Sequence, residues 1–316
     1  MPVDPDLRPL LEEAERSASD SYRVIGPARA RQVVADQMRV FESRADPPSE
    51  VESFDTTLPG DAGPVPVRLY TAKAPPPRPG IVFMHGGGWT YGSIATHDGI
   101  VGRLAARAGA TVVSVGYRLS PEAPFPRALN DTVAAVRWTA ERSDELGVDP
   151  RRLAVAGDSA GGNLAIACAL RLRDDGGPQL AAQLAFYPQL DATLSQPSVM
   201  ELAEGYMLDR DTILWGIEQY VADDSLRSEP LVSPLHADDL AGMPAALVVT
   251  GEYDPLRDEG EAYARRLRDC GVLVTHTSEP GLLHGFLGFT GVSRACKRAE
   301  QRAFAAAAAL LAEDRS

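Results

Sequence analysis

The stretch Gly157-Asp158-Ser159-Ala160-Gly161-Gly162 decides the fold. The short apolar run Leu153-Ala154-Val155-Ala156 before it is typical of a strand, and the Ala- and Leu-rich residues 163–173 after it predict a helix. A Gly-x-Ser-x-Gly pattern between a strand and a helix requires a sharp turn, with glycine wherever a Cβ would clash. Such a turn lifts the Ser159 hydroxyl clear of the sheet, in the position that a nucleophile needs.

A second glycine-rich stretch, His85-Gly86-Gly87-Gly88-Trp89, directly follows the apolar run Ile81-Val82-Phe83-Met84. Three consecutive glycines after a buried strand leave backbone N–H groups uncovered. Acyl-transfer chemistry needs such donors for the negative charge that develops on the substrate oxygen. Either stretch alone could be an ordinary tight turn, but a tight turn gives no reason for both to occur.

The length of 316 residues fits two average domains or one large α/β domain equally well. A net charge of −13 argues against nucleic acid or an anionic membrane as a partner, because both attract Lys and Arg. The cysteines Cys168, Cys270 and Cys296 lack metal-ligand spacing and are expected to be free thiols, so no metal site is predicted.

The N-terminal residues predict a cytoplasmic location. Acidic residues such as Asp4 and Glu12 stand where a signal peptide needs a basic start and an apolar core. No run of about 18 apolar residues occurs in the chain, so stable membrane insertion is not expected.

The order of the predicted elements indicates a mostly parallel sheet. Residues 51–58 and 65–70 predict a hairpin, and the proline-rich residues 75–79 are expected to be neither helix nor central strand. Helical patterns then alternate with the apolar runs 81–84, 111–115, 153–156, 181–186, 245–250 and 272–277. Alternation of this kind predicts helices on both faces of the sheet and a ligand site beyond the C-terminal ends of the strands.

Two parts of the chain interrupt the alternation. Residues 1–48 contain two helical patterns before any strand, and residues 190–230 contain a helical pattern from about 209 to 221. We expect both parts to form a helical cap over the strand ends. The predicted division is therefore an N-terminal cap part at 1–48 and a catalytic domain at 49–316, with a cap insertion at about 190–230.

A serine nucleophile needs a base, and the base needs a carboxylate that holds its tautomer. His284 is the best candidate base, because it follows an expected turn at residues 279–281 after the last strand and has apolar neighbours. His85 is expected to brace the glycine loop, and His97 and His236 lie in polar, loop-like segments. His276 falls within a strand pattern, where packing or a surface position is the expected role.

Asp254 is the candidate carboxylate, because it lies a few residues past the end of an apolar strand. Glu252 competes with it at the same strand end. The acidic residues Asp258, Glu259 and Glu261 are interpreted as the solvated first turn of a helix. The order Ser159, Asp254, His284 is the order of the α/β-hydrolase triad.

Six stretches together resemble the hormone-sensitive-lipase-like carboxylesterases, bacterial family IV. They are residues 85–89, Tyr117-Arg118-Leu119-Ser120-Pro121-Glu122, residues 157–162, Tyr187-Pro188, residues 254–260 and His284-Gly285-Phe286. The resemblance covers residues from about 80 to 290 and implies an α/β-hydrolase fold with a mostly parallel eight-stranded sheet and a cap.

Residue by residue, the resemblance implies roles for the two glycine motifs and the triad. Ser159 would be the nucleophile, His284 the base and then the acid, and Asp254 its partner, which settles Glu252 as a neighbour. The oxyanion hole would consist of the N–H groups of Gly87, Gly88 and Ala160. Gly86 would shape the loop and His85 would support it. Glu122 would lie near the site in a structural role.

The predicted function is hydrolysis of short- to medium-chain carboxylic esters through an acyl-enzyme, with a small ester and water as partners and no cofactor. The predicted acyl or alcohol pocket is lined by apolar residues near the strand ends: Trp89, Tyr187, Met207, Leu208, Trp215, Leu283 and Phe286. The resemblance also suggests a homodimer. Two alternatives stay open: an amidase or deacetylase acting on small N- or O-acyl compounds, and a non-catalytic binding protein, which the presence of His284 disfavours.

Overall fold

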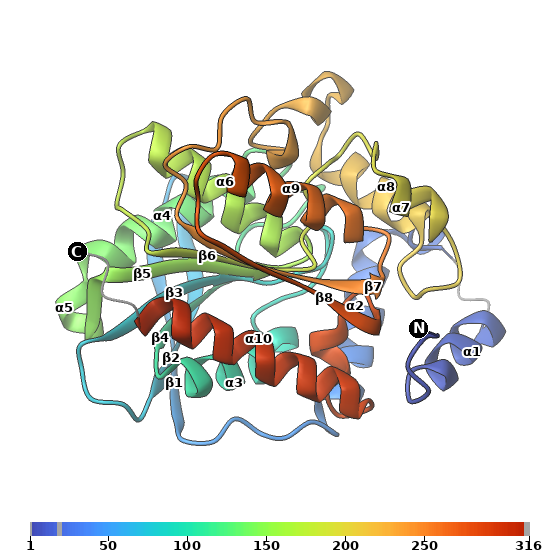
Figure 1. Ribbon diagram of the computed structural model, residues 1–316, viewed down its shortest axis with the longest axis horizontal. Helices are drawn as coiled ribbons and strands as arrows, with labels where there is room; N and C mark the ends of the chain where they lie inside the picture. The colour runs from blue at the N-terminus through green and yellow to red at the C-terminus, as the bar shows by residue number, and fades with distance from the viewer. Residues whose placement is uncertain (1, 18–20, 313–316) are drawn as a thin grey trace.

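The computed structural model describes residues 2–17 and 21–312 and contains an eight-stranded sheet (Figure 1). The strand order is β1-β2-β4-β3-β5-β6-β7-β8. Strand β2 is antiparallel to both neighbours, and β4, β3, β5, β6, β7 and β8 are parallel to one another. The strands are β1 (Val51–Gly60), β2 (Gly63–Ala72), β3 (Arg78–Met84), β4 (Thr111–Val115), β5 (Val148–Asp158), β6 (Ala182–Phe186), β7 (Ala245–Tyr253) and β8 (Val274–Leu283).

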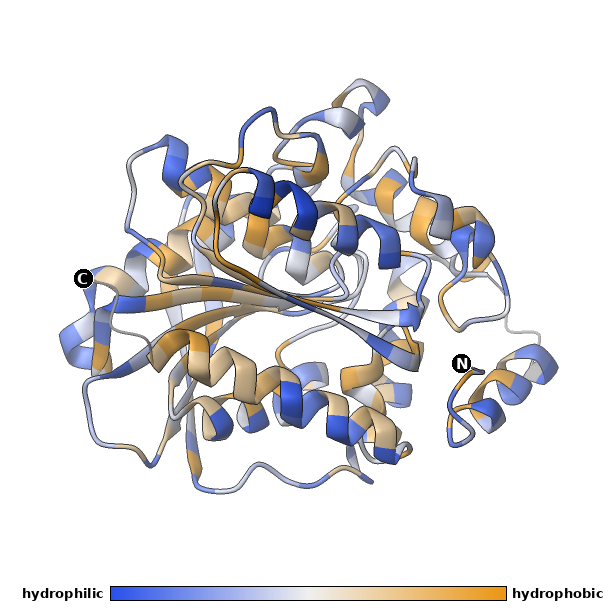
Figure 2. Ribbon diagram, in the orientation of Figure 1, coloured by the Kyte–Doolittle hydropathy of each residue, from blue (hydrophilic) through white to orange (hydrophobic). Residues whose placement is uncertain are grey.

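The central strands are apolar on both sides because helices cover both faces of the sheet. In β3, Val82 and Met84 belong to one core, whereas Ile81 and Phe83 belong to the other, as the two-residue period of a strand requires. Figure 2 shows the same pattern, with hydrophobic strands in the middle and hydrophilic surfaces on the outer helices. The predicted mostly parallel sheet with helices on both faces is confirmed.

Two groups of helices form the outer layers (Figure 1). Helices α3 and α10 pack on one face, and α4, α6 and α9 pack on the other. The helices are α1 (Arg8–Ser17), α2 (Tyr22–Glu42), α3 (Asp98–Ala108), α4 (Arg127–Glu141), α5 (Ser143–Leu146), α6 (Ala160–Asp174), α7 (Pro197–Glu201), α8 (Arg210–Tyr220), α9 (Arg257–Asp269) and α10 (Arg294–Ala312). Short 3-10 helices are η1 (Ala95–His97), η2 (Asp224–Ser228), η3 (Pro234–His236) and η4 (Phe286–Phe289).

Two boundaries differ from the sequence prediction. Strand β3 begins at Arg78, so Pro79 lies inside a strand that the proline run was expected to exclude. The register against β5 shifts between Arg78 and Gly80, and this irregularity accommodates a residue without an N–H donor. Strand β8 continues to Leu283, through the residues expected to form a turn, with a second register shift opposite Gly251 and Tyr253.

Helix α2 contacts α8, and residues of both helices lie beside Ser159 and His284, which follow β5 and β8. A kink at Gly26, with φ 74°, precedes Pro27 and separates the first residues of α2 from the rest. Arg23 joins these first residues to α8 through its ion pair with Glu218 at 2.6 Å. Among the described residues, none of the helices combines the length and the apolar character that crossing a membrane requires.

Candidate active site

Ser159 lies on a sharp turn between β5 and α6. Its backbone has φ 54° and ψ −122°, a strained region for a residue with a side chain. A Cβ on Gly161 would overlap the Met84 carbonyl oxygen, so the turn can form only with glycine there. The Ser159 N–H donates to the Phe186 carbonyl at 2.9 Å, which ties the turn to β6.

Ser159, His284 and Asp254 form a continuous chain of hydrogen bonds. The distance from His284 Nε2 to Ser159 Oγ is 2.9 Å, and that from His284 Nδ1 to Asp254 Oδ2 is also 2.9 Å. Asp254 directly follows β7 and is fully buried, and its Oδ1 accepts the Leu256 N–H at 2.8 Å. A buried carboxylate on Nδ1 leaves Nε2 free to accept the serine proton.

The other carboxylates near Asp254 have different partners. Glu252 Oε2 accepts the Gly281 N–H at 2.7 Å, at the edge where β7 meets β8. Glu259, expected to be solvated, is fully buried in the first turn of α9. It accepts the N–H groups of Leu190 and Asp191, so it is part of the interior rather than of the surface.

The glycine loop after β3 is folded so that its carbonyl groups are bound within the loop. The Gly87 carbonyl accepts the N–H groups of Thr90 and Tyr91, and the Thr90 hydroxyl donates to the Gly88 carbonyl at 3.0 Å. Gly87 and Gly88 have φ of 121° and 53°, and a Cβ on Gly87 would overlap the Tyr91 backbone. Within the described residues, the N–H groups of Gly87 and Gly88 have no hydrogen-bond partner.

Ala160 begins α6, and the N–H groups of a first helical turn have no acceptor within the helix. Gly87 and Gly88 line the same cavity as Ser159, and Ala160 directly follows Ser159 in the chain. These donors, with the hydrogen-bonded triad, can bind a carbonyl oxygen while Ser159 attacks its carbon.

The sequence predicts that His97 lies in a polar loop, but the structure buries it next to this glycine loop. Its Nε2 lies 3.2 Å from Asp158 Oδ1, and the same oxygen accepts the Gly86 N–H at 2.8 Å. Burial lowers the pKa of His97, but the Asp158 carboxylate, a hydrogen bond with the Ser93 backbone and the charge of Glu42 together outweigh this and leave the pKa above its usual value. The neighbouring His85 has its pKa lowered to about 3 by burial and by the charge of His97.

A cavity of about 200 Å³ opens beside the triad. Its wall combines the site residues with apolar side chains of α2, α8 and η4. The residues that line it are Tyr22, Val34, Gln37, Met38, Phe41, Gly86, Gly87, Gly88, Tyr91, Gly92, His97, Ile100, Asp158, Ser159, Tyr187, Gln189, Met207, Leu208, Thr212, Ile213, His284, Gly285, Gly288 and Phe289.

Three of the seven predicted pocket residues line this cavity: Tyr187, Met207 and Leu208. The other four lie behind the wall. Trp89 is buried and stacks on Tyr220, with ring centroids 4.4 Å apart, and Trp215 packs against Tyr22 at 5.8 Å.

Leu283 and Phe286 are the other two predicted pocket residues that do not line the cavity. Leu283 ends β8 with its side chain fully buried, and Phe286 packs against Tyr187 with ring centroids 5.0 Å apart. These apolar side chains fill space between the sheet and the wall rather than facing the cavity.

The sequence prediction missed the contribution of α2 to the cavity wall. Val34, Met38 and Phe41 lie at i, i+4 and i+7, on one face of that helix, and all three line the cavity. This spacing was the signal available, but it indicated only a covering helix. Tyr22, at the start of α2, also lines the cavity and packs edge-on against Tyr91 at 5.3 Å.

Arg31 of α2 connects this covering helix to the glycine loop. Its Nε donates to the Thr90 carbonyl at 2.8 Å, and Nη2 donates to the Ser120 carbonyl at 2.9 Å. The guanidinium also pairs with both carboxylate oxygens of Glu122. Arg31 therefore links Glu122 to the glycine loop. No sequence motif indicated this role of Arg31.

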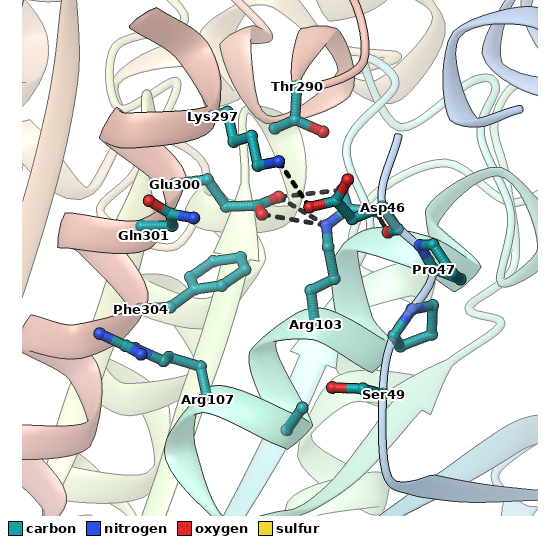
Figure 3. Close-up of a pocket in the computed structure, with 12 residues that line it drawn as sticks. Asp46, Pro47, Ser49, Arg103, Arg107, Thr290, Lys297, Glu300, Gln301 and Phe304 are labelled. Carbon is teal, nitrogen blue, oxygen red and sulfur yellow. Dashed lines mark hydrogen bonds and ion pairs between the residues drawn. The ribbon is translucent and has the colours of Figure 1, made fainter. Parts of the chain in front are cut away.

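A second cavity, of about 340 Å³, lies between the segment after α2, α3 and α10 (Figure 3). Four of its charged side chains form ion pairs with one another: Arg103 with Glu300, and Lys297 with Asp46 at 2.6 Å. None of the triad residues lines it. Among the described residues, no group of three His, Cys, Asp or Glu side chains could hold a metal ion.

Comparison with known proteins shows the family of the chain. A family described as having the alpha/beta hydrolase fold matches residues 81–288. The chain is 40% identical over 312 residues to carboxylesterase NlhH of Mycobacterium tuberculosis, covering 96% of this chain and 95% of that protein. It is 37% identical over 297 residues to an ethyl acetate hydrolase of Pseudomonas putida, covering 91% and 92% of the two chains.

Solved esterase structures have the same fold as this chain. A hyperthermophilic esterase from Pyrobaculum calidifontis superposes with a TM-score of 0.90 at 37% identity, covering 98% of this chain and 99% of that chain. A thermostable esterase from Pseudomonas putida superposes with a TM-score of 0.93 at 34% identity, covering 99% of both. The chain belongs to the α/β-hydrolase family, in the branch of the hormone-sensitive-lipase-like carboxylesterases.

Proposed function

We propose that the protein is a serine carboxylesterase that hydrolyses short- to medium-chain esters through an acyl-enzyme. The observation that supports this most directly is the hydrogen-bond chain from Ser159 through His284 to Asp254, with 2.9 Å at each step. It joins a nucleophile, a base and a buried carboxylate in the order that acyl transfer needs.

In the first half-reaction, Ser159 Oγ attacks the ester carbonyl carbon while its proton passes to His284 Nε2. The carbonyl oxygen becomes an oxyanion that accepts hydrogen bonds from Gly87, Gly88 and Ala160. Collapse of this intermediate breaks the bond to the alcohol oxygen, which takes the proton from His284. One such donor contributes about 3 kcal/mol of transition-state stabilisation in other enzymes.

In the second half-reaction, His284 accepts a proton from water, and the water oxygen attacks the acyl carbon of the acyl-enzyme. A second oxyanion forms at the same donors. When it collapses, Ser159 Oγ leaves with the proton from His284, and the carboxylic acid is released. Asp254 stabilises the imidazolium in both halves without taking its proton.

The size of the cavity supports small esters. A volume of about 200 Å³ suits a short or medium acyl group better than a long chain. Met38 and Phe41 of α2 and Phe289 of η4 contribute apolar surface to the wall, which favours an alkyl or aryl group. We assign the cap role to the predicted parts 1–48, of which residues 1 and 18–20 lie outside the described residues, and about 190–230, because α2, Met207 and Leu208 contribute to this wall.

Hydrolysis of p-nitrophenyl esters, from acetate to long acyl chains, tests this function. We expect turnover of short and medium chains, little turnover of long ones, and loss of activity in Ser159→Ala. If the folded protein cleaves none of these esters, an amide-selective hydrolase or a binding protein becomes the better reading, and N-acyl substrates distinguish the two. The cytoplasmic location remains a prediction from the N-terminal residues. The homodimer remains a prediction from the family resemblance, and light scattering tests it.

A further inference from the structure

Two buried titratable side chains next to the glycine loop have no part in the proposed reaction steps. Asp158 immediately precedes Ser159, and its Oδ1 accepts the Gly86 N–H at 2.8 Å. His97 lies against the same carboxylate, with Nε2 3.2 Å from Oδ1 and 3.4 Å from Oδ2. The exposed fraction of each side chain is only 8%, and both residues line the active-site cavity.

The imidazole of His97 is fixed from both ring nitrogens. Nδ1 lies 2.9 Å from the Thr96 hydroxyl, and that hydroxyl also donates to the Ser93 carbonyl and accepts the Ser93 N–H. The ring packs beside Phe83 and His85, at centroid distances of 6.3 Å and 5.6 Å. The Nε2 edge is therefore held toward Asp158.

The geometry links the loop that carries Gly87 and Gly88 to the turn that carries Ser159. A Cβ on Gly86 would overlap the Asp158 side chain, so the loop lies directly against the carboxylate. The Tyr117 hydroxyl donates to the His85 carbonyl at 2.7 Å, which holds the loop at the preceding residue. The Asp158 carboxylate thus connects the loop that carries the Gly87 and Gly88 N–H donors to Ser159.

The charge of Asp158 creates a problem that His97 can solve. An unpaired carboxylate beside Ser159 would repel the negative charge that forms on the substrate oxygen, and the burial of the Asp158 side chain weakens screening by solvent. When His97 is protonated, its imidazolium compensates this charge, and the Asp158 carboxylate raises the pKa of His97 in favour of that state. The charge of His97 in turn keeps the pKa of Asp158 below its usual value despite burial. The Gly86 N–H lies 3.3 Å from His97 Nε2 and 2.8 Å from Asp158 Oδ1, so the carboxylate is its nearer acceptor. Asp158 can then accept from Gly86 without opposing the oxyanion.

We infer that His97 and Asp158 form a positioning pair: Asp158 fixes the glycine loop relative to Ser159, and His97 holds and neutralises Asp158. The inference deepens the proposed esterase function and rests on it. Neither side chain needs to touch the substrate. The pair would act on transition-state stabilisation, because the donors at Gly87 and Gly88 keep their place only while the loop does.

The test combines His97→Asn, His97→Gln, Asp158→Asn and the double variant Asp158→Asn/His97→Asn. Asp158→Asn retains an oxygen that can accept the Gly86 N–H and removes the charge that His97 compensates. Each variant is measured for kcat and KM on p-nitrophenyl butyrate and for inhibition by an alkyl trifluoromethyl ketone. Ser159 adds to this ketone, its proton passes to His284, and the ketone oxygen becomes an oxyanion held by the same donors. His276→Asn, on β8, is the matched control.

In His97→Asn we expect kcat to fall about 10- to 100-fold, less than for loss of a complete donor, with KM changed by no more than about threefold. Inhibition by the trifluoromethyl ketone should weaken in parallel with kcat. Asp158→Asn should lose less activity than His97→Asn. The kcat of the double variant should be at least that of His97→Asn, because the double variant no longer carries the uncompensated Asp158 charge. If the two side chains acted independently, the fold-losses in kcat of the two single variants would instead multiply in the double variant.

Thermal unfolding and circular dichroism establish that each variant is folded. If His97→Asn fails to fold, His97→Gln and the double variant carry the same comparison. Unchanged kcat in a folded His97 variant, a loss confined to KM, or multiplying losses in the double variant would each overturn the inference. Wild-type turnover and its absence in Ser159→Ala are measured alongside, so a failure of the esterase function itself is seen separately.

Discussion

Replacement of Glu259 tests how the loop after β6 is held beside the nucleophile. Glu259 is fully buried in the first turn of α9, and its Oε2 accepts the N–H groups of Leu190 and Asp191, the latter at 2.9 Å. One residue earlier, the Gln189 N–H donates to the Ser159 carbonyl at 3.2 Å. Helix α9 therefore supports the Ser159 turn through this loop.

In Glu259→Ala, two buried N–H groups lose their acceptor. An unsatisfied buried donor costs about 1–3 kcal/mol, so we expect the free energy of unfolding to fall by about 2–6 kcal/mol. Glu259→Gln retains an acceptor oxygen and nearly the same volume, and it should remain within about 1 kcal/mol of wild type at acidic pH. Urea unfolding followed by circular dichroism measures both. A loss below about 1 kcal/mol in Glu259→Ala would refute the reasoning.

The same pair of proteins tests the ionisation of Glu259. Burial raises the pKa of this carboxyl well above its usual value, and the charge of Asp191 acts in the same direction. The folded protein therefore binds a proton that the unfolded chain releases above about pH 4.3, and wild-type stability falls as pH rises toward the folded-state pKa. Glu259→Gln does not ionise, so its stability relative to wild type should rise across this window. If the free energies of unfolding of wild type and Glu259→Gln change with pH in parallel, the raised pKa of Glu259 is wrong.

Three further substitutions test other contacts. Arg31→Met removes charged donors from two backbone carbonyls, including that of Thr90, and should lower the free energy of unfolding by about 2–4 kcal/mol in urea titrations, with Arg31→Lys losing less. Met38→Ala removes side-chain volume from the cavity wall, which enlarges the cavity, and should shift the preferred p-nitrophenyl ester toward longer acyl chains. An unchanged preference would show that Met38 does not limit the substrate pocket. Gly161→Ala places a Cβ against the Met84 carbonyl and should prevent recovery of folded protein, as judged by circular dichroism.

The sheet could be predicted because its signal is local. Apolar runs such as residues 81–84 and 111–115 coincide with strands, since a strand covered on both faces needs consecutive apolar side chains. Boundaries were harder, as Pro79 and the extension of β8 to Leu283 demonstrate. There, pairing with a neighbouring strand overrode the local turn signals.

The triad and the oxyanion donors could also be proposed from the sequence. Ser159 and the glycine loop have demanding backbone conformations that only a few residue types allow, so they leave a recognisable motif. Asp254 and His284 lie directly after strands and could be placed by topology. The apolar pocket residues could not be placed equally well, because an apolar residue near a strand end can face the cavity or fill the core behind it, as Trp89 does.

The polar residues that escaped prediction share a physical property: each binds a partner that is distant in the sequence. His97 and Asp158 are 61 residues apart, Glu259 and Leu190 are 69 apart, and Arg31 and Thr90 are 59 apart. For Glu259 and Arg31 the partner is a backbone group. Every residue type has a backbone carbonyl, and every type except proline has a backbone N–H, so the sequence does not mark such a partner. Periodicity reveals where apolar side chains are buried, but it carries no information on which charged side chain enters the interior to satisfy a particular N–H or carbonyl. Such contacts become visible only when the chain is folded, and here they gather around the loops that carry the nucleophile and the oxyanion donors.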